Sequence, residues 1–374
     1  MSRVTLVSQH HDAAWVTPDA FILGDETRDG LSRALVRRGW AVDVLVEADF
    51  DADIGRGGVT WRFRRPAPLS RTMRALGRAA GDPHPPIRSL APHLLRALRE
   101  HPPDVIHAFD LVFYPLLWSL GHLGPPVIAH FHGGSAARRP LWRAAESAAL
   151  ARVQRLLFTT LEHARPWIRN GYPAHRVRLV FETSVERMGQ HLLEQVDPGV
   201  QGAPMIACVG RLDAVKDPIT TLAGFERFLA TSPDASLHLA WTDAPLHAEV
   251  VRRARSLGPH VRLHGRLSRA GSRALIARAD ALVQGSTREV CGIAVLEAMS
   301  LGVPPVVTDI PSFRAILGDC GAMFRPADPE GMARGLGAVL SDPSQSARCR
   351  ARFDTLLSFD ALALEVERVY RELV

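Results

Sequence analysis

Residues Ser286 to Met299 read STREVCGIAVLEAM and lie between two apolar runs, Ala281 to Gln284 and Val303 to Val307. An apolar run, a polar loop, a helical pattern and a second apolar run predict a strand, a loop, a helix and a strand. Open α/β sheets bind their ligands at the carboxyl ends of strands, so the loop that carries Glu289 is where a ligand would lie. Gly292 opens the helix and allows the backbone to approach that ligand closely.

The start of this helix has the chemistry of an anion site. The backbone N–H groups of residues 291 to 295 would point out of the helix, and helix N-termini favour phosphates and polar sugars. Glu297 lies about one and a half turns further along, where it can accept hydrogen bonds from hydroxyl groups. Solvated glutamates without a function fit the same spacing, so Glu289 and Glu297 do not define a site by themselves.

Length and composition limit the class of protein. The chain has 374 residues, too many for one ordinary core, and two domains are expected. Apolar residues make up 47% and charged residues 22%, which is typical of a soluble globular protein. The four cysteines are far apart and show no CxxC spacing, which disfavours a disulfide framework or a zinc site. The N-terminus has no signal-peptide pattern, so we expect a cytoplasmic protein.

Strand patterns alternate with helix patterns in both halves, which predicts parallel sheets with crossover helices. A polar loop is expected from Ser8 to Gly24. A polar segment at 186–204 is the expected linker between an N-terminal domain, 1–185, and a C-terminal domain, 205–353. The last stretch, 354–374, carries apolar residues at helical spacing and is expected to be a helix.

The only lysine of the chain stands out because every other one of the 45 basic residues is arginine. Lys216 falls in a glycine-led loop, Gly210 to Asp217, that follows a predicted strand. Arg211 and Lys216 can converge on one dianionic group, arginine as a planar fork and lysine as a point charge. The loop lacks the G-K-[ST] ending of a P-loop, so no Mg-ATP site is implied.

Together these motifs resemble the retaining GT-B glycosyltransferases of group 1, family 4. The resemblance rests on Gly210-Arg211-Leu212 with Lys216-Asp217, on Glu289 and Glu297, on Gly302, and on shorter matches at 103–107, 131–133, 324–329 and 358–370. It covers nearly the whole chain. It implies an α/β GT-B fold, with two Rossmann-like domains facing across a cleft and the C-terminal helix crossing back onto the N-domain.

The resemblance also implies a reaction. A sugar would move from a nucleotide-diphosphate sugar to an acceptor hydroxyl with retention of the anomeric configuration, without a divalent metal and without a cofactor. Arg211 and Lys216 would hold the diphosphate, Glu297 the ribose and Glu289 the sugar. His132 would reach the sugar from the N-domain, and His130 is a weaker candidate.

The implied residues fall into two sets. The implied catalytic residues are Glu289, His132, Arg211 and Lys216. The implied donor-binding residues are Gly210, Arg211, Lys216, Gly265, Arg266, Ser286, Glu289, Cys291, Gly292, Ile293 and Glu297. Among these, Gly265 and Arg266 would lie near the base.

Several positions depart from the family pattern. Trp241 and its neighbours stand where Gly-x-Gly-Pro is usual, Glu182 to Val185 replace Asn-Gly-Val-Asp, and Cys291 replaces a common phenylalanine. These positions would read the base, the sugar or the acceptor, although core packing is the more expected role for Trp241. The alternative is therefore a catalytically degenerate nucleotide-sugar-binding protein of the same fold. A Rossmann oxidoreductase is disfavoured because no GxGxxG follows a predicted strand.

The expected partners are a nucleotide sugar and an acceptor that the sequence does not identify. The arginine-rich region from Arg62 to Arg99 includes a stretch, Leu69 to Ala80, that can form a basic amphipathic helix against anionic lipid at the inner face of the membrane, or simply a solvated face. Nucleic acid is not an expected partner because aromatic residues make up only 6% and no recognition motif occurs. The oligomeric state stays open.

Overall fold

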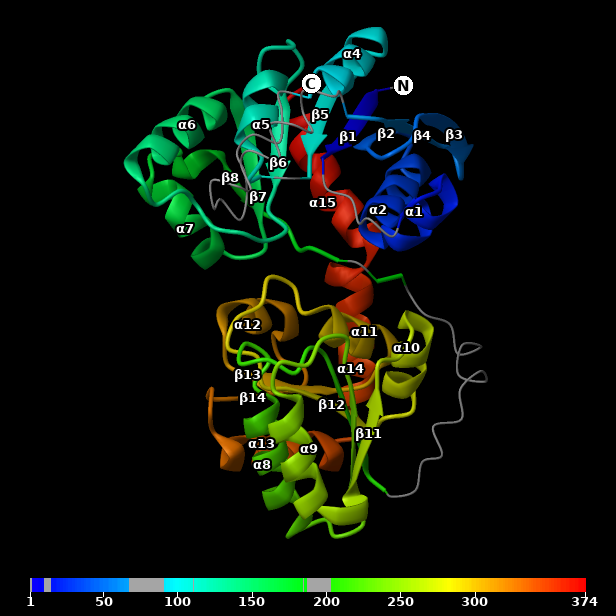
Figure 1. Cartoon of the computed structure of the whole chain (residues 1–374), viewed down its shortest axis with the longest axis vertical. Helices are drawn as coiled ribbons and strands as arrows, with labels where there is room; N and C mark the ends of the chain where they lie inside the picture. The colour runs from blue at the N-terminus through cyan, green and yellow to red at the C-terminus, as the bar shows by residue number, and fades with distance from the viewer. Residues whose placement is uncertain (1, 10–14, 67–90, 110, 184, 187–202) are drawn as a thin grey trace. The chain divides into compact units, whose positions relative to one another are not determined.

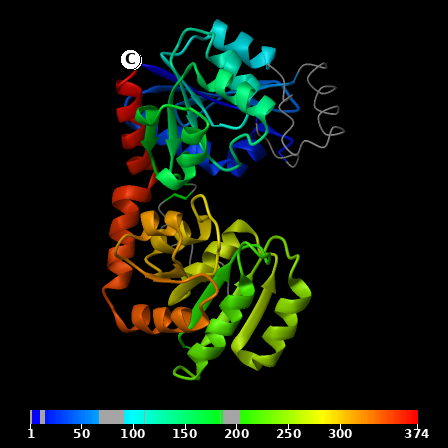
Figure 2. The ribbon, with the colours of Figure 1, turned by 90° about the vertical axis from the view of Figure 1, so that its left-hand side faces the viewer.

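A computed structural model of the chain describes residues 2–9, 15–66, 91–109, 111–183, 185–186 and 203–374. It divides into two compact units (Figure 1). Unit 1 comprises Met1–Ser184 together with Phe359–Val374, and unit 2 comprises Val185–Ser358. Each unit is built on its own sheet, with helices packed on it (Figure 2).

Unit 1 contains a sheet whose strands run in the order β3-β4-β2-β1-β5-β6-β7-β8, all parallel to their neighbours except β3, which is antiparallel to β4. The strands are β1 (Arg3–Ser8), β2 (Ala41–Glu47), β3 (Ala52–Arg56), β4 (Val59–Arg64), β5 (Val105–Ala108), β6 (Val127–His130), β7 (Val153–Phe158) and β8 (Val177–Leu179). The helices are α1 (Pro18–Gly24), α2 (Glu26–Arg37), α4 (Pro92–Glu100), α5 (Tyr114–Leu120), α6 (Pro140–Leu150), α7 (Leu161–Arg169) and α15 (Phe359–Arg371), with a short 3₁₀ turn at Ala174–Arg176.

The expected polar loop from Ser8 to Gly24 is wrong over its last seven residues, which form α1. Thr17 caps this helix by accepting a hydrogen bond from the N–H of Ala20 at 3.2 Å, and proline follows at the first helical position. Both are strong helix-start signals. Phe21 and Ile22 of α1 are buried, so tertiary packing completes the helix.

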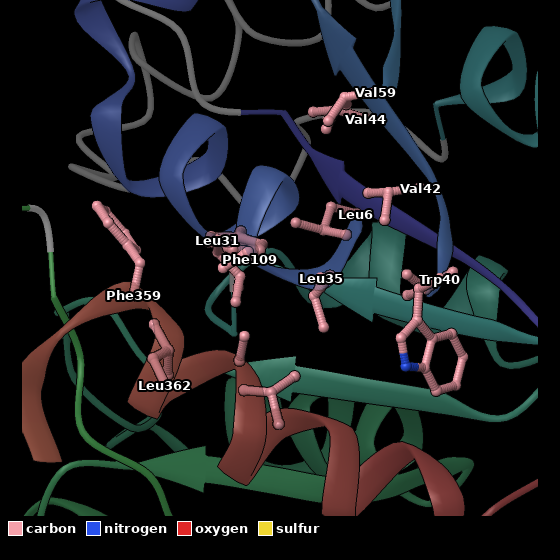
Figure 3. Close-up of a cluster of buried hydrophobic side chains, with 14 of the residues drawn as sticks. Leu6, Leu31, Leu35, Trp40, Val42, Val44, Val59, Phe109, Phe359 and Leu362 are labelled. Atoms are coloured by element: carbon pink, nitrogen blue, oxygen red, sulfur yellow. The ribbon is translucent and has the colours of Figure 1, made fainter. Parts of the chain in front are cut away.

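The last helix, α15 (red in Figure 1), packs against α2 within unit 1. Phe359 and Leu362 join the buried cluster around Leu31 and Leu35 (Figure 3). Near its other end, the buried Tyr370 hydroxyl lies 2.7 Å from Nδ1 of His107 on β5. A helix was expected over 354–374, but α15 begins only at Phe359, because residues 353–357 form a π-helical turn that belongs to unit 2.

Unit 2 contains a wholly parallel sheet in the order β11-β10-β9-β12-β13-β14. The strands are β9 (Met205–Val209), β10 (Ser236–Ala240), β11 (Val261–Gly265), β12 (Ala281–Gln284), β13 (Pro305–Thr308) and β14 (Ala322–Phe324). The helices are α8 (Pro218–Leu229), α9 (His247–Ser256), α10 (Arg269–Ala277), α11 (Ile293–Leu301), α12 (Pro311–Leu317), α13 (Pro329–Ser341) and α14 (Gln345–Arg352), with a 3₁₀ turn at Gly258–His260 and the π-helical turn at Phe353–Leu357.

The arginine-rich region from Arg62 to Arg99 is described only at its two ends, in β4 and α4. The expected basic helix from Leu69 to Ala80 lies outside the described residues. Within the part of the chain that is described, every helix is too short or too polar to cross a membrane.

Candidate functional site

The site begins at the point where the strand order of unit 2 reverses. Strand β9 is followed in the chain by β10 and β11 on one side of it, whereas β12 pairs with its other side. Such a switch point leaves a crevice outside the carboxyl ends of the two central strands. The loop after β9 starts at Gly210, and the loop after β12 starts at Gly285, so both predicted motifs leave the sheet at this switch point.

The loop after β9 is shaped by Asp213. Its Oδ1 accepts hydrogen bonds from the N–H groups of Val215 at 3.0 Å and Lys216 at 2.9 Å, an Asx-type turn that bends the chain back. Asp217 then adopts φ 43° and caps α8 by accepting from the N–H of Thr220 at 3.0 Å. The left-handed backbone of Asp217 is costly for a residue other than glycine, so the surrounding hydrogen bonds must stabilise it. The same hydrogen bonds hold Lys216, the preceding residue, in place.

Lys216 and Glu289 form an ion pair between the two loops. The same Oε1 of Glu289 accepts a hydrogen bond from the Ser286 hydroxyl at 2.7 Å. The backbone joins the loops too, because Thr287 donates its N–H to the carbonyl of Val215 at 2.8 Å. The structure therefore brings Lys216, Ser286 and Glu289 together as a half-buried charged group at the carboxyl ends of β9 and β12.

Gly210 lies beside this group. A Cβ at Gly210 would lie 3.7 Å from Cδ of Lys216 and 3.3 Å from the Gln284 amide. Arg211 follows with a half-exposed side chain that pairs with Asp213 at 3.0 Å. Arg211 and Lys216, the two cations that are predicted to bind the diphosphate, thus lie on one loop, and each is paired with a carboxylate.

Gly292 starts α11 in a conformation that favours glycine. Its φ is 65°, and a Cβ there would lie 2.6 Å from Cε1 of Phe313 on α12. Cys291 is buried just before it, and Ile293 is exposed just after it. Of the N–H groups expected to point out of the helix, that of Val295 does not, because it donates to the carbonyl of Gly292 at 2.9 Å.

Glu297 lies inside α11 and is almost fully buried. Its Oε1 accepts a hydrogen bond from Nε of Arg273 on α10 at 2.8 Å. A buried carboxylate needs such a partner to stay ionised. The predicted ribose ligand is therefore a carboxylate oriented by a neighbouring helix and not a solvated side chain.

The last predicted donor-binding residues follow β11. Gly265 has φ 70°, and its carbonyl accepts the N–H of Trp241 at 3.0 Å, whereas Arg266 is exposed. Trp241 packs at the edge of the unit 2 core, with its ring edge-on to His247 at 5.6 Å. Its neighbour Asp243 accepts the N–H of Leu212 at 2.8 Å, which ties this loop to the cationic loop.

Sequence reasoning missed Asp213, Arg273 and Gln284. Asp213 carried a local signal, because an aspartate within a short glycine-led loop is a frequent turn former. Gln284 also carried one, because a polar residue ends an otherwise apolar strand, and its Oε1 is buried with no partner among the described residues. Arg273 carried none, since its pairing with Glu297 joins two helices that the sequence does not place. No set of three potential metal-ligating side chains gathers anywhere in the described parts of the chain.

His132 belongs to unit 1, on the loop after β6. Its Nδ1 lies 2.6 Å from Oε1 of Glu182. The ring of His130 is 4.5 Å away, and His107 lies next in the row, 5.5 Å from His130. Burial, followed by the charge of His132, lowers the pKa of His107 to about 3 and that of His130 well below its usual value.

These histidines predict an acid-sensitive unit 1. The unfolded chain binds protons below about pH 6.5, but folded His107 does not until about pH 3, so its stabilising contribution is complete above pH 6.5 and is lost as the pH falls. Between pH 6.5 and 5, His107 alone should lower the free energy of unfolding by about 2 kcal/mol. Urea unfolding at pH 7, 6 and 5 measures this slope. His107→Gln should reduce it by about one proton, and an unchanged slope would contradict the assignment.

Two known domain descriptions match this chain. Residues 27–181 match the Glycosyl transferase 4-like domain, and residues 194–353 match Glycosyl transferases group 1. The chain is 26% identical over 300 residues to a glycogen synthase of Mycobacterium tuberculosis, which covers 72% of this chain and 68% of that protein. It is 27% identical over 241 residues to the GDP-mannose:cellobiosyl-diphosphopolyprenol alpha-mannosyltransferase of Xanthomonas oryzae, 62% of each chain.

Solved structures share the fold at low identity. A trehalose-6-phosphate structure from E. coli with bound UDP-2-fluoro glucose superposes with a TM-score of 0.74 at 14% identity, over all of both chains. Sucrose-phosphate synthase from Thermosynechococcus elongatus gives 0.68 at 19% identity, over 100% of this chain and 99% of the other. The fold is GT-B, which confirms the expected fold class. With both halves matched, the chain belongs to the group 1 glycosyltransferases.

Proposed function

We propose that this protein transfers a glycosyl group from a nucleotide-diphosphate sugar to an acceptor hydroxyl, with retention of the anomeric configuration and without a divalent metal. One observation carries the proposal: the only lysine of the chain is paired with Glu289 at the switch point of unit 2. The names of the relatives support a nucleotide-sugar donor, since one of them is GDP-mannose-dependent.

The proposed chemistry is electrostatic. Negative charge grows on the diphosphate as its bond to the sugar breaks, and preorganised cations near that charge lower the barrier. Lys216, Arg211 and the N-terminus of α11 are assigned to this charge, the work that a divalent metal does in other transferases. When the donor binds, Lys216 would exchange its ion pair with Glu289 for one with the diphosphate. Glu289 would then accept hydrogen bonds from the sugar hydroxyls.

The remaining predicted residues receive roles by the same chemistry. Arg273 donates a hydrogen bond to the Glu297 carboxylate and directs it, which suits Glu297 to the two ribose hydroxyls. Gly265 and Arg266 are assigned to the base, and His132 to the transferred sugar. Ser286 fixes Glu289, and Gly292 allows the close approach of the diphosphate.

A second candidate function is nucleotide-sugar binding without transfer. It is favoured by the pairing of Lys216 with Glu289 and of Glu297 with Arg273, which leaves the predicted donor ligands engaged with protein partners. The replaced segment from Glu182 to Val185 points the same way. Donor binding with no release of the nucleoside diphosphate, across all acceptors, would favour this function.

A lipid-linked acceptor at a membrane surface is compatible with the arginine-rich region from Arg62 to Arg99. Two relatives act, by their names, on lipid substrates: the Xanthomonas mannosyltransferase and a phosphatidyl-myo-inositol mannosyltransferase of Mycolicibacterium smegmatis, 27% identical over 169 residues. We therefore assign this region to contact with anionic lipid at the cytoplasmic face.

A thermal-shift screen with UDP-, GDP- and ADP-sugars tests the proposal. A donor at 100 times its Kd stabilises the fold by about 2.7 kcal/mol, so the matching donor should raise the Tm by about 5 °C or more. The donor so identified is then incubated with EDTA, and nucleoside diphosphate release and the anomeric configuration of the product are measured. No shift with any donor, or turnover that EDTA abolishes, would contradict the proposal.

A further inference from the structure

A pocket of about 510 Å³ lies at the amino ends of β6, β7 and β8 in unit 1. Three arginines line it: Arg152 directly precedes β7, Arg155 lies within β7, and Arg176 directly precedes β8. The three strands are neighbours in the sheet, so residues that are distant in the sequence meet here. Because α/β sheets place their substrates at the carboxyl ends of strands, the fold alone does not account for a charged pocket at this edge.

A bulge in β7 shapes the pocket. Val127 of β6 pairs with Val153 of β7. The next pair joins Ile128 to Arg155, so Gln154 is an extra residue in β7. The N–H of Val127 donates to Oε1 of Gln154 at 2.6 Å, which satisfies the backbone group that the bulge displaces. Bulges are rare between parallel strands and re-aim the side chains beside them, and here both Gln154 and Arg155 line the pocket.

Two glycines keep side chains out of the pocket. Gly121 lies between α5 and β6, and a Cβ there would lie 2.7 Å from Cβ of Arg152. A larger residue at this position would therefore push Arg152 away. Gly124 of the same loop has φ 105°, with open space where its Cβ would be. Both glycines line the pocket, so this part of its wall is backbone and leaves room for a ligand.

The arginines of the pocket outnumber the carboxylates around them. Arg155 pairs with Glu372 at 3.1 Å, and Arg178 of β8 pairs with the same carboxylate at 2.7 Å. Within the described part of the chain, neither Arg152 nor Arg176 pairs with a carboxylate. No acidic side chain of the described residues lines the pocket. Four positive charges therefore meet one negative charge, and like charges so placed repel one another until an anion binds.

A second carboxylate near Arg176 is already engaged. Arg176 also lines a neighbouring cavity of about 240 Å³ that contains the buried Glu146. The Tyr114 hydroxyl donates to Oε1 of Glu146, as does the N–H of Ala137 at 3.1 Å. The amide of Asn170 donates to its Oε2 at 2.6 Å. These three donors hold Glu146 within unit 1, so its carboxylate does not serve as the counter-charge of the arginine pocket.

The positive charges gather around the start of β7. The buried Tyr172 hydroxyl donates to the carbonyl of Val153, the first residue of β7, at 3.0 Å. Burial raises the pKa of Tyr172, and the positive charges of Arg176, Arg155 and Arg178 oppose that rise. A phosphate group suits such a place, because it carries up to two negative charges and several acceptor oxygens, and the planar guanidinium of arginine binds two of these oxygens at once.

We propose that this pocket binds a phosphate group through Arg152, Arg155 and Arg176, and that the group belongs to a phosphorylated small molecule or to a phospholipid head group. The site involves none of the residues assigned above to the donor, so the inference does not rest on the proposed function. It gives the protein a second place, at the amino ends of the unit 1 strands, where a phosphate compound binds and stabilises the folded chain.

Calorimetric titration of the full chain with pyrophosphate at low ionic strength tests the site. Arg152→Gln and Arg176→Gln should each weaken binding about 10-fold or more, because each removes a charge-assisted hydrogen bond. Neither arginine pairs with a carboxylate of the described residues, so the Tm without ligand should stay the same or rise as repulsion is relieved. Arg165→Gln is the matched control: it removes the same charge from an exposed position on α7 outside the pocket, and its binding should match the wild type.

Two further arms identify the site and the source of the phosphate. Lys216→Ala removes a cation from the predicted donor site, and pyrophosphate binding that survives this change but is lost in the double variant of Arg152→Gln and Arg176→Gln supports the pocket. Phosphatidylcholine vesicles with and without phosphatidic acid replace pyrophosphate in the second arm, and a loss of binding in the double variant with these vesicles alone assigns the phosphate to a lipid. The proposal is overturned if the wild type binds neither probe, if the double variant binds both as the wild type does, or if the arginine variants lower the Tm of the ligand-free protein as structural residues would.

Discussion

Lys216→Ala is expected to lower donor turnover by about 100- to 1,000-fold, the effect of removing one preorganised group from a site of developing charge. Lys216 is the only lysine of the chain, and its ammonium group meets the Glu289 carboxylate at the carboxyl ends of β9 and β12. The fold should tolerate the change, because Asp213 shapes the loop through backbone N–H groups and not through the lysine side chain. Nucleoside diphosphate release and the donor-induced Tm shift measure the two effects.

The controls for Lys216 come from the same unit. Arg227→Ala removes a positive charge from α8, where the side chain is half-exposed and pairs with Glu330, and turnover should stay at the wild-type rate. Lys216→Arg keeps the charge, but a planar guanidinium cannot replace a point charge in a space this close to Gly210 and should restore activity only in part. If Lys216→Ala turned the donor over at the wild-type rate, the assignment of Lys216 to the donor site would be wrong.

Gly292→Ala is expected to cost about 2 to 5 kcal/mol of stability and to abolish the donor-induced Tm shift. Two terms add: an alanine in the left-handed region is strained by about 1 to 2 kcal/mol, and overpacking a filled space costs about 1 to 3 kcal/mol. Gly292 has φ 65°, and the new Cβ would lie 2.6 Å from the ring of Phe313, which is fully buried. Either α12 or the start of α11 has to move, and the predicted anion site moves with it.

Two other glycines separate these terms. Gly265→Ala has φ 70° but open space around the Cβ, so it should show the strain alone. Gly337→Ala lies in α13 with open space and no unusual φ, and it should be neutral or slightly stabilising. Adding Phe313→Leu to Gly292→Ala should recover part of the overpacking term. Equal urea midpoints for Gly292→Ala and Gly265→Ala would show that the close contact with Phe313 does not exist.

The sequence predicted the buried parallel strands well because such strands are short apolar runs that need no knowledge of their neighbours. Ala281–Gln284 and Val105–Ala108 are examples. It could not predict β3, Ala52–Arg56, because this strand pairs at the sheet edge through its backbone and its side chains are mostly exposed. In the site, the loop that carries Lys216 and the glycine that begins α11 could be predicted from the sequence, because glycine, lysine and aspartate carry strong local signals.

The hydrogen-bond partners of the site residues could not be predicted from the sequence. Arg273 reaches Glu297 from another helix, and Glu182 reaches His132 across 50 residues of chain. Contacts of this kind depend on how helices and loops pack on the sheet, and a single sequence holds no record of that packing. The roles of the predicted donor-binding residues stay predictions that the variants above test.

Helix α15 makes the order of synthesis matter for this protein. Residues 1–184 leave the ribosome long before Phe359 to Arg371 are made, yet Leu31, Leu35 and Trp40 have their packing partners in that last helix. Until then, the growing chain presents this apolar face to water or to a chaperone, and N-terminal domains that fold during translation do not usually wait in this way. A message cut short before Phe359 therefore yields a first domain with an uncovered core, which protein quality control can recognise even though every predicted donor-binding residue of unit 2 has been made.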